Sequence, residues 1–223
     1  MLLYVKSTKG IKRLTKEERS FYSIIDNIGE ILVGIFLSDG HISRRTKTSN
    51  PRFHFHQSGK IQKRPYFYLV YESFKIFCTK DYSNYIRTWI DKKTKQEYSS
   101  ISFTTMQLPC FISIHNAWYL NGRKRVPHNI MDILTPVGLA HWIMGDGSRK
   151  NKGLHLSVYS FTTDEVNLLI KVLNNKFGVK CSIHNHSSVG NKPRIYIWQE
   201  SMDLLRLQVN EYIIPSMKYK IGK

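Results

Sequence analysis

An apolar segment that ends in Asp-Gly occurs twice in this chain, and the two copies lie about half the chain apart. The first covers residues 31–40 and ends in Asp39 and Gly40, and the second covers residues 138–147 and ends in Asp146 and Gly147. Each run predicts a buried helix that a glycine ends. A single Asp-Gly would be an ordinary helix terminus. Because this one is duplicated, we expect a chain of two related halves whose aspartates act together.

The segments that follow the two copies are also alike. Residues 52–58 and 154–160 alternate polar and apolar side chains, which is the period of a half-buried strand. Each is followed by a helical pattern, at residues 66–77 and from Thr163 onward. Further strands are predicted at residues 85–90, 98–104, 179–186 and 194–199. The order αββαββα in each half, with antiparallel strands and helices on one face, predicts an α+β fold.

The boundary between the halves lies near Pro127 and Pro136. We expect a basic N-terminal lead-in, a first half, a linker and a second half, at residues 1–22, 23–123, 124–135 and 136–223. The lead-in is rich in Lys and Arg, and we expect it to be solvated and poorly ordered.

The charge balance is strongly basic. Lys and Arg number 34 against 16 Asp and Glu, for a formal net charge of +18. An excess of this size favours a polyanionic partner, with nucleic acid as the first candidate and a membrane surface as the second. The basic residues are spread along the chain and mixed with aromatic ones, which indicates a folded binding surface rather than a basic tail. Charge alone leaves DNA, RNA and no partner at all open.

Cysteine and hydropathy patterns exclude several classes of protein. The three cysteines, Cys78, Cys110 and Cys181, form no CxxC pair, which argues against a zinc ribbon. Their odd number favours reduced thiols in an intracellular compartment. No apolar run approaches the roughly 20 residues that span a bilayer, and no secretory signal is visible. We therefore expect an intracellular protein with no membrane partner.

At the two Asp-Gly segments the sequence resembles the LAGLIDADG homing endonucleases, in the single-chain form with two motifs. The motifs read Leu-Val-Gly-Ile-Phe-Leu-Ser-Asp-Gly at residues 32–40 and Leu-Ala-His-Trp-Ile-Met-Gly-Asp-Gly at residues 139–147. Further family-like segments lie at residues 55–58, 119–127, 134–136, 159–162 and 214–220. The resemblance therefore covers about residues 24–221.

The two copies depart from the family motif at three positions. Its first Asp is Leu37 in one copy and Met144 in the other, but only the second Asp binds metal in the family. Its Gly is His141 in the second copy. Since that Gly lets the two motif helices approach each other, we expect a looser or shifted helix crossing here.

The resemblance implies a pseudo-two-fold protein whose two antiparallel sheets form a DNA-binding saddle. The implied activity is that of a sequence-specific endonuclease, which makes staggered double-strand breaks with short 3′ overhangs in a long double-stranded DNA target. The resemblance also implies a monomer and an intron or intein setting in a mitochondrion, another organelle or a microbe. One alternative is an intron maturase that binds RNA without cleavage. Another is a DNA-binding regulator with a degenerate nuclease fold.

The chemistry of phosphodiester hydrolysis favours Asp39 and Asp146 as ligands of divalent metal ions. Hard cations such as Mg²⁺ take oxygen ligands and keep several waters, so few carboxylates are needed. Two carboxylates that meet repel each other unless cations lie between them. We expect Mn²⁺ to substitute for Mg²⁺, and Ca²⁺ to support binding with little cutting. Gln57, at a strand end, is expected to hold a metal-bound water, with Ser160 as its counterpart.

The resemblance also points to one basic residue in each half near the scissile phosphates. The candidates are Lys124 and Lys220, with Arg125 and Lys218 as rivals. A cation there can orient water or offset charge on the phosphate. The alternative for each is a solvated surface lysine.

Strand parity predicts which side chains face the nucleic acid. The apolar residues of three strands are expected to point toward the helices, namely Phe53, Phe55, Cys181, Ile183, Ile195 and Ile197. The outward side chains of the same strands, with basic residues near the motifs, are the expected DNA contacts: Arg44, Arg45, Arg52, His54, His56, Lys150, Lys180, Ser182, His184, His186, Lys192, Arg194, Tyr196 and Trp198. A sheet face that is merely solvated is the alternative.

Overall fold

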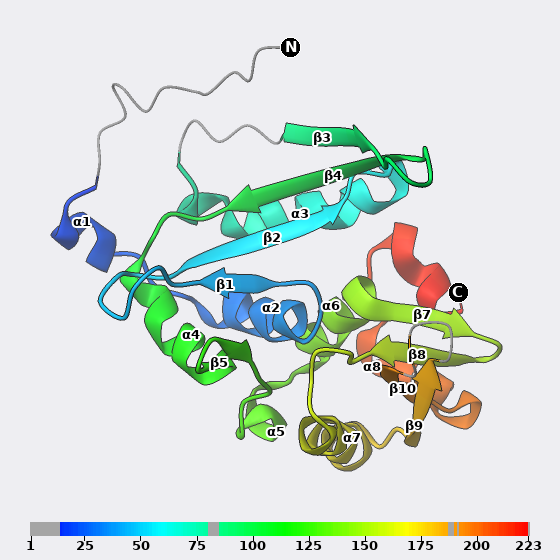
Figure 1. Cartoon of the computed structure of the whole chain (residues 1–223). Helices are drawn as coiled ribbons and strands as arrows, with labels where there is room; N and C mark the ends of the chain where they lie inside the picture. The colour runs from blue at the N-terminus through cyan, green and yellow to red at the C-terminus, as the bar shows by residue number, and fades with distance from the viewer. Residues whose placement is uncertain (1–13, 80–84, 187–189, 191, 223) are drawn as a thin grey trace.

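The computed structural model describes residues 14–79, 85–186, 190 and 192–222, without the side chains of Tyr85 and His186. Two four-stranded antiparallel sheets, each packed against helices, make up most of these residues. The chain completes the first sheet before it enters the second (Figure 1). Helices and antiparallel strands in this arrangement confirm the predicted α+β fold.

The two halves repeat one order of elements, which is the predicted αββαββα. The first half contains α2 (Asp26–Leu37), β1 (His41–Ser43), β2 (Arg52–Ser58), α3 (Arg64–Phe74), β3 (Tyr85–Ile90), β4 (Glu97–Thr104) and α4 (Ile112–Trp118). The second half contains α6 (Pro136–Asp146), β7 (Gly147–Lys150), β8 (Gly153–Ser157), α7 (Thr163–Phe177), β9 (Cys181–His186), β10 (Lys192–Ile197) and α8 (Met202–Val209).

Shorter elements lie before, between and after these. They are α1 (Lys16–Ser20), a hairpin of β5 (Tyr119–Leu120) and β6 (Arg123–Lys124), α5 (Ile130–Ile133), and the 3₁₀ turns η1 (Ile61–Lys63), η2 (Lys75–Phe77), η3 (Pro109–Phe111), η5 (Gln199–Ser201) and η6 (Pro215–Ile221).

Both sheets have the same topology. The strand order is β1-β2-β4-β3 in the first sheet and β7-β8-β10-β9 in the second. The registers also correspond, since His41 of β1 lies opposite His54 of β2, and Ser148 of β7 lies opposite His155 of β8. His41 and Ser148 therefore occupy equivalent positions, each two residues after a motif aspartate.

One face of each sheet packs against helices. Phe53 and Phe55 of β2 are buried, and the ring centroid of Phe55 lies 6.0 Å from that of Phe67 on α3. Ile195 and Ile197 of β10 are fully buried in the same way. The alternating burial of β2 leaves Arg52, His54 and His56 on the opposite face, as the sequence pattern predicts.

Helices α2 and α6 pack along each other at the centre of the molecule. A Cβ atom on Gly34 would overlap the backbone of Gly138 and lie 2.7 Å from the Cβ atom of His141. The crossing is therefore tight rather than loose, with Gly34 of α2 against the backbone of Gly138 on α6. His141 is buried, with its Nδ1 atom 3.2 Å from the Tyr66 hydroxyl. Burial lowers the pKa of His141 to about 4, so this histidine is neutral.

Two details differ from the prediction. Ile183 is 41% exposed although the parity of β9 turns it toward the helices, because β9 is an edge strand and is covered on one flank only. Residues 1–13 of the lead-in lie outside the described residues, but residues 16–20 form helix α1. The helix is ordered by a capping box, in which the Thr15 hydroxyl accepts from the amide of Glu18.

Candidate active site at the ends of the central helices

The two motif helices end side by side. A Cβ atom on Gly145 of α6 would lie 2.3 Å from the Oγ atom of Ser38, which follows α2. No side chain fits between the two helix ends at this point. The aspartates that follow, Asp39 and Asp146, therefore emerge next to each other.

The motif glycines allow the tight turns that directly follow these aspartates. The amide of Gly40 donates to the carbonyl oxygen of Ile35 at 2.8 Å, and a Cβ atom on Gly40 would lie 2.7 Å from that oxygen. A Cβ atom on Gly147 would lie 2.5 Å from the carbonyl oxygen of Ile143. Only glycine permits this close return of the chain, after which β1 and β7 begin at once.

Asp39, Asp146 and Lys124 line one cavity with a volume of about 640 Å³. Both halves contribute to its wall, because His41 and Tyr119 come from the first half while Ser157, Tyr159 and Ser160 come from the second. The structure thus brings together two predicted carboxylates and one predicted lysine.

The cavity disfavours two free negative charges. Burial and the neighbouring Asp39 carboxylate raise the pKa of Asp146 to about 7. A divalent cation between the carboxylates would remove this penalty, so the donor set fits a hard metal ion. Among the described residues, no cluster of three or more His, Cys, Asp or Glu could hold a metal. Water and phosphate oxygens would therefore have to complete the coordination.

Lys124 caps the end of α2 beside Asp39. Its Nζ atom donates to the carbonyl oxygens of Ser38 at 2.9 Å and Gly40 at 2.8 Å, which flank the aspartate in the chain. Burial lowers the pKa of Lys124 to about 8, although both aspartates oppose this shift. Its rival Arg125 points elsewhere and donates to the carbonyl oxygen of Ala117 at 3.1 Å.

Lys220 has the same relation to α6. Its Nζ atom donates to the carbonyl oxygens of Ile143, Met144 and Gly145, at 3.1, 2.6 and 3.2 Å. The side chain is only 3% exposed, and burial, followed by the charge of Lys63, lowers its pKa to about 7. The backbone carbonyl groups at the end of each motif helix thus bind the ammonium group of one lysine. Of these two lysines, only Lys124 lines the cavity described above.

Gln57 is not brought to this cavity. It lies on β2 with the parity of Phe53 and Phe55, and it is 7% exposed on the side of the sheet that faces the helices. Sequence reasoning missed His41 and Tyr119, which do line the cavity. The available signal for His41 was its position two residues after Asp39.

On the first sheet the outward row contains a hydrogen-bonded histidine. The Nε2 atom of His54 lies 2.7 Å from Ser43 Oγ, and its Nδ1 atom lies 3.1 Å from Thr104 Oγ1. Burial lowers the pKa of His54 to about 4, with a further contribution from Arg52. Arg52 and His56, on the same row, are exposed.

On the second sheet four outward side chains form one cluster. The ring of His184 stacks on Tyr196 with centroids 4.6 Å apart, and its Nδ1 atom lies 3.4 Å from Nε2 of His155. The Nη1 atom of Arg194 lies 3.4 Å from Nδ1 of His155. His155, which the sequence did not single out, therefore lies at the centre of a cluster of predicted DNA contacts.

The remaining predicted contacts have varied surroundings. Arg44 donates to the carbonyl oxygen of Ser49, and Lys180 forms an ion pair with Glu200. Ser182 accepts a hydrogen bond from the Trp198 indole, and Lys192 lies over the Tyr159 ring. Arg45 and Lys150 are exposed, and the side chain of His186 lies outside the described residues.

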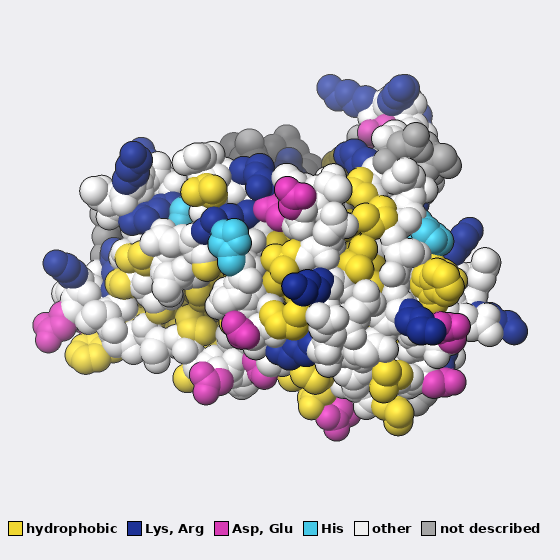
Figure 2. Space-filling model, turned by 90° about the horizontal axis from the view of Figure 1, so that it is seen from below, with side chains coloured by type: hydrophobic (Ala, Val, Ile, Leu, Met, Phe, Trp, Pro, Cys, Tyr) yellow, Lys and Arg dark blue, Asp and Glu magenta, His cyan; other side chains and the backbone are white. Residues whose placement is uncertain are grey.

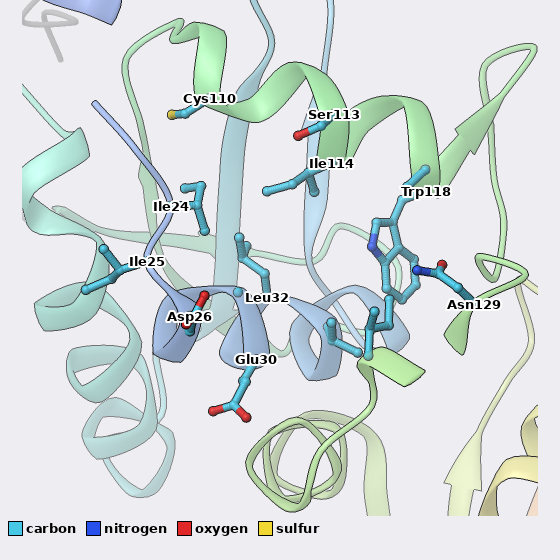
Figure 3. Close-up of a pocket in the computed structure, with 14 residues that line it drawn as sticks. Ile24, Ile25, Asp26, Glu30, Leu32, Cys110, Ser113, Ile114, Trp118 and Asn129 are labelled. Carbon is cyan, nitrogen blue, oxygen red and sulfur yellow. The ribbon is translucent and has the colours of Figure 1, made fainter. Parts of the chain in front are cut away.

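A second cavity, of about 480 Å³, lies between α2 and α4. The side chains of Leu32 and Ile114 converge on it, whereas Glu30 points away (Figure 3). Its described lining is mainly apolar, with acidic Asp26 and Glu30 and neither Lys nor Arg, so it is unsuited to a phosphate backbone. On the face that carries α5 and α7, basic side chains are interspersed with acidic and apolar ones (Figure 2).

Comparison with protein families matches residues 29–205 to the LAGLIDADG DNA endonuclease family. The chain belongs to this family. Among solved LAGLIDADG structures, the homing endonuclease I-WcaI bound to its DNA recognition sequence superposes with a TM-score of 0.84 and 25% sequence identity, over 96% of this chain and 95% of that one.

The LAGLIDADG relatives include maturases as well as endonucleases. The chain is 32% identical over 197 residues to the cytochrome b mRNA maturase bI2 of Debaryomyces hansenii, which covers 86% of this chain and 72% of that protein. It is 33% identical to the Saccharomyces cerevisiae maturase of the same name, but spans only 47% of its length. The intron-encoded endonuclease ai4 of Dictyostelium discoideum is 33% identical, over 69% of this chain and 99% of its own. Every described helix of this LAGLIDADG chain is too short or too polar to cross a membrane.

Proposed function

We propose that this protein is a sequence-specific homing endonuclease that makes a staggered double-strand break in a long DNA target by metal-assisted hydrolysis. The observation that carries the proposal is the meeting of Asp39 and Asp146, one from each half, in a cavity that Lys124 also lines. The likeness to I-WcaI, which was solved on its DNA recognition sequence, supports it.

Each group of the site has a task in this reaction. When bound at the two carboxylates, Mg²⁺ or Mn²⁺ supplies Lewis-acid chemistry at the scissile phosphates. Asp39 and Asp146 provide oxygen ligands for the cations. Lys124 and Lys220 fix the helix ends that carry these aspartates, and the ammonium group of Lys124, which lines the cavity, offsets negative charge that develops on the phosphate.

The sheets hold the DNA on either side of the cavity. A groove-facing sheet reads base edges with Arg and polar side chains and positions the backbone with Lys. The outward rows, with Arg52, His54 and His56 on one sheet and Arg194 and Tyr196 on the other, provide these groups. In this proposal residues 23–123 and 136–223 each bind one half of the target, so one monomer with its linker at 124–135 is sufficient.

A second candidate function is intron maturation. The relatives named cytochrome b mRNA maturase bI2 cover most of this chain at about one-third identity, which favours intron RNA as a further partner. An intron-encoded protein of a mitochondrion would fit both functions. The presence of both aspartates favours cleavage, since RNA binding alone does not require them.

The decisive experiment exposes a library of DNA targets to the protein with Mg²⁺. Wild-type protein should cut a specific subset, whereas Asp39→Asn should bind the same targets and cut none. Asp26→Asn, at the other end of α2, is the matched control and should cut normally. If wild-type protein binds intron RNA but breaks no target, the maturase function replaces the endonuclease.

A further inference from the structure

His41 lines the cavity that Asp39 and Asp146 share, and the equivalent position in the second half is not a histidine. It is the first residue of β1, it is exposed, and it lines the cavity with Asp39, Lys124 and Asp146. Its ring lies 5.9 Å from that of Tyr119 in an edge-to-face arrangement and 5.7 Å from that of His54. The ring is therefore held in place on two sides.

Tyr119 determines which nitrogen of His41 is free. The amide of Ile42 donates to the Tyr119 hydroxyl oxygen at 3.3 Å, and the same hydroxyl lies 3.0 Å from Nδ1 of His41, to which it can donate its own proton. A histidine whose Nδ1 atom accepts a hydrogen bond carries its proton on Nε2. Among the described residues Nε2 of His41 has no hydrogen-bond partner, so its N–H group can serve a ligand in the cavity.

Tyr119 is itself positioned by its neighbours. Its ring stacks on His115 with centroids 5.2 Å apart and an interplanar angle of 6°, and it belongs to the hairpin that carries Lys124. In that hairpin Tyr119 is the strand partner of Lys124. One small element thus places both a cation and a histidine-orienting hydroxyl at the same cavity.

The equivalent position of the second half carries a different side chain. The equivalent position, two residues after Asp146, is Ser148, which is exposed on β7. Ser148 pairs with His155 as His41 pairs with His54. The two sides of the aspartate pair therefore offer different hydrogen-bond donors to the two DNA strands.

We propose that His41 is a catalytic residue for one strand only: its Nε2–H group donates to a non-bridging oxygen of the scissile phosphate on the Lys124 side. Tyr119 is its positioning residue. This inference rests on the proposed endonuclease function. Removal of a preorganised donor to the reacting group costs about 100-fold or more in rate where the transition-state charge is large. Since cations share that charge here, we expect a loss of roughly 10-fold in one strand's cutting rate.

The test follows both strands of one target, each with its own label, in single-turnover reactions with Mg²⁺. His41→Ala should slow one strand by roughly 10-fold, leave the other strand and DNA affinity unchanged, and accumulate a nicked product. His41→Gln, whose amide can donate from a similar position, should recover part of the loss. Tyr119→Phe should slow the same strand to a smaller extent. Ser148→Ala is the matched control and should not slow the His41-dependent strand.

The outcomes separate the two claims. Equal slowing of both strands by His41→Ala would assign His41 a structural role and overturn the inference, and so would unchanged rates on both strands. The inference would also be overturned if Ser148→Ala, but not His41→Ala, slowed the strand on the Lys124 side. Wild-type protein that cuts neither strand would instead overturn the proposed function.

Discussion

Gly34 lies so close to Gly138 across the helix pair that a Cβ atom on Gly34 would be 2.0 Å from the carbonyl oxygen of Gly138. The backbone of Gly138 cannot move away at this point unless α2 and α6 separate. The two aspartates lie at the ends of these helices. The distance between Asp39 and Asp146 is therefore set by a glycine contact within the helix interface.

The first prediction is that Gly34→Ala destabilises the protein strongly, by about 3 kcal/mol or more, because an overlap with backbone forces the helices apart. Gly29→Ala is the matched control on the same helix. A Cβ atom there would meet only the Ile24 side chain at 3.9 Å, so alanine should be neutral or stabilise by up to about 1 kcal/mol. Urea unfolding of both variants measures the difference. Equal stabilities would contradict the tight crossing.

This contact also shows what the sequence could and could not predict. The paired motifs and the strand alternation predicted both halves and the burial of Phe53 and Phe55, because periodicity reports directly on burial. The tight crossing was missed, since a motif read position by position aligns His141 with Gly34 and gives no role to Gly138. His155 was missed because its cross-strand neighbours depend on register, which the sequence pattern does not specify.

The second prediction concerns Asp146 and pH. Its pKa rises from the ordinary 3.8 to about 7 on folding, so its ionisation opposes folding. This cost is absent below about pH 4, grows as the pH rises, and is complete above about pH 7. In EDTA, Asp146→Asn should therefore relieve about 2 kcal/mol at pH 8, roughly half of the full ionisation cost because the Asn amide is also desolvated. Tm should rise by roughly 4–8 °C at pH 8 and change little at pH 4.

Calorimetry at both pH values checks this result. Asp132→Asn, which removes an exposed carboxylate from α5, is the control and should show no gain that grows with pH. Mg²⁺ should stabilise the wild-type protein more than Asp146→Asn, since the cation relieves the same repulsion. A Tm that falls in Asp146→Asn at pH 8 would mean that the carboxylate stabilises the metal-free fold.

The third prediction separates binding from cutting by the choice of cation. Ca²⁺ tolerates looser geometry than Mg²⁺ and activates water less well. DNA affinity should therefore be similar in Ca²⁺ and Mg²⁺, while cutting should occur with Mg²⁺ or Mn²⁺ and fall at least about 100-fold with Ca²⁺. Gel-shift and cleavage assays on one target measure both quantities. Full cutting in EDTA would exclude a metal-assisted reaction.

The last prediction concerns Arg194 and Lys192, two side chains on the outward face of β10. The Nη1 atom of Arg194 lies 3.4 Å from Nδ1 of His155. Burial, followed by the charge of Arg194, lowers the pKa of His155 to about 4. His155 is therefore neutral at neutral pH, and the two side chains do not repel each other as two cations would. The Nε atom of Arg194 is buried and has no hydrogen-bond partner among the described residues, so the guanidinium group is oriented but keeps a free hydrogen-bond donor. Lys192 is exposed at the start of the strand. Such a difference is expected between a base-reading arginine and a phosphate-binding lysine.

Arg194→Ala should therefore relax discrimination at one or two base pairs by about 1–3 kcal/mol, because a bidentate contact to a guanine edge is lost. Lys192→Ala should weaken binding to all sequences alike and lower the slope of log affinity against log salt by about one unit. Cleavage profiles on targets with every single-base substitution, and binding titrations at several salt concentrations, measure the two effects. His155→Ala should resemble Arg194→Ala in part, since the arginine then loses the partner that orients it. Unchanged profiles and affinities for all three variants would mean that another face of the molecule meets the DNA.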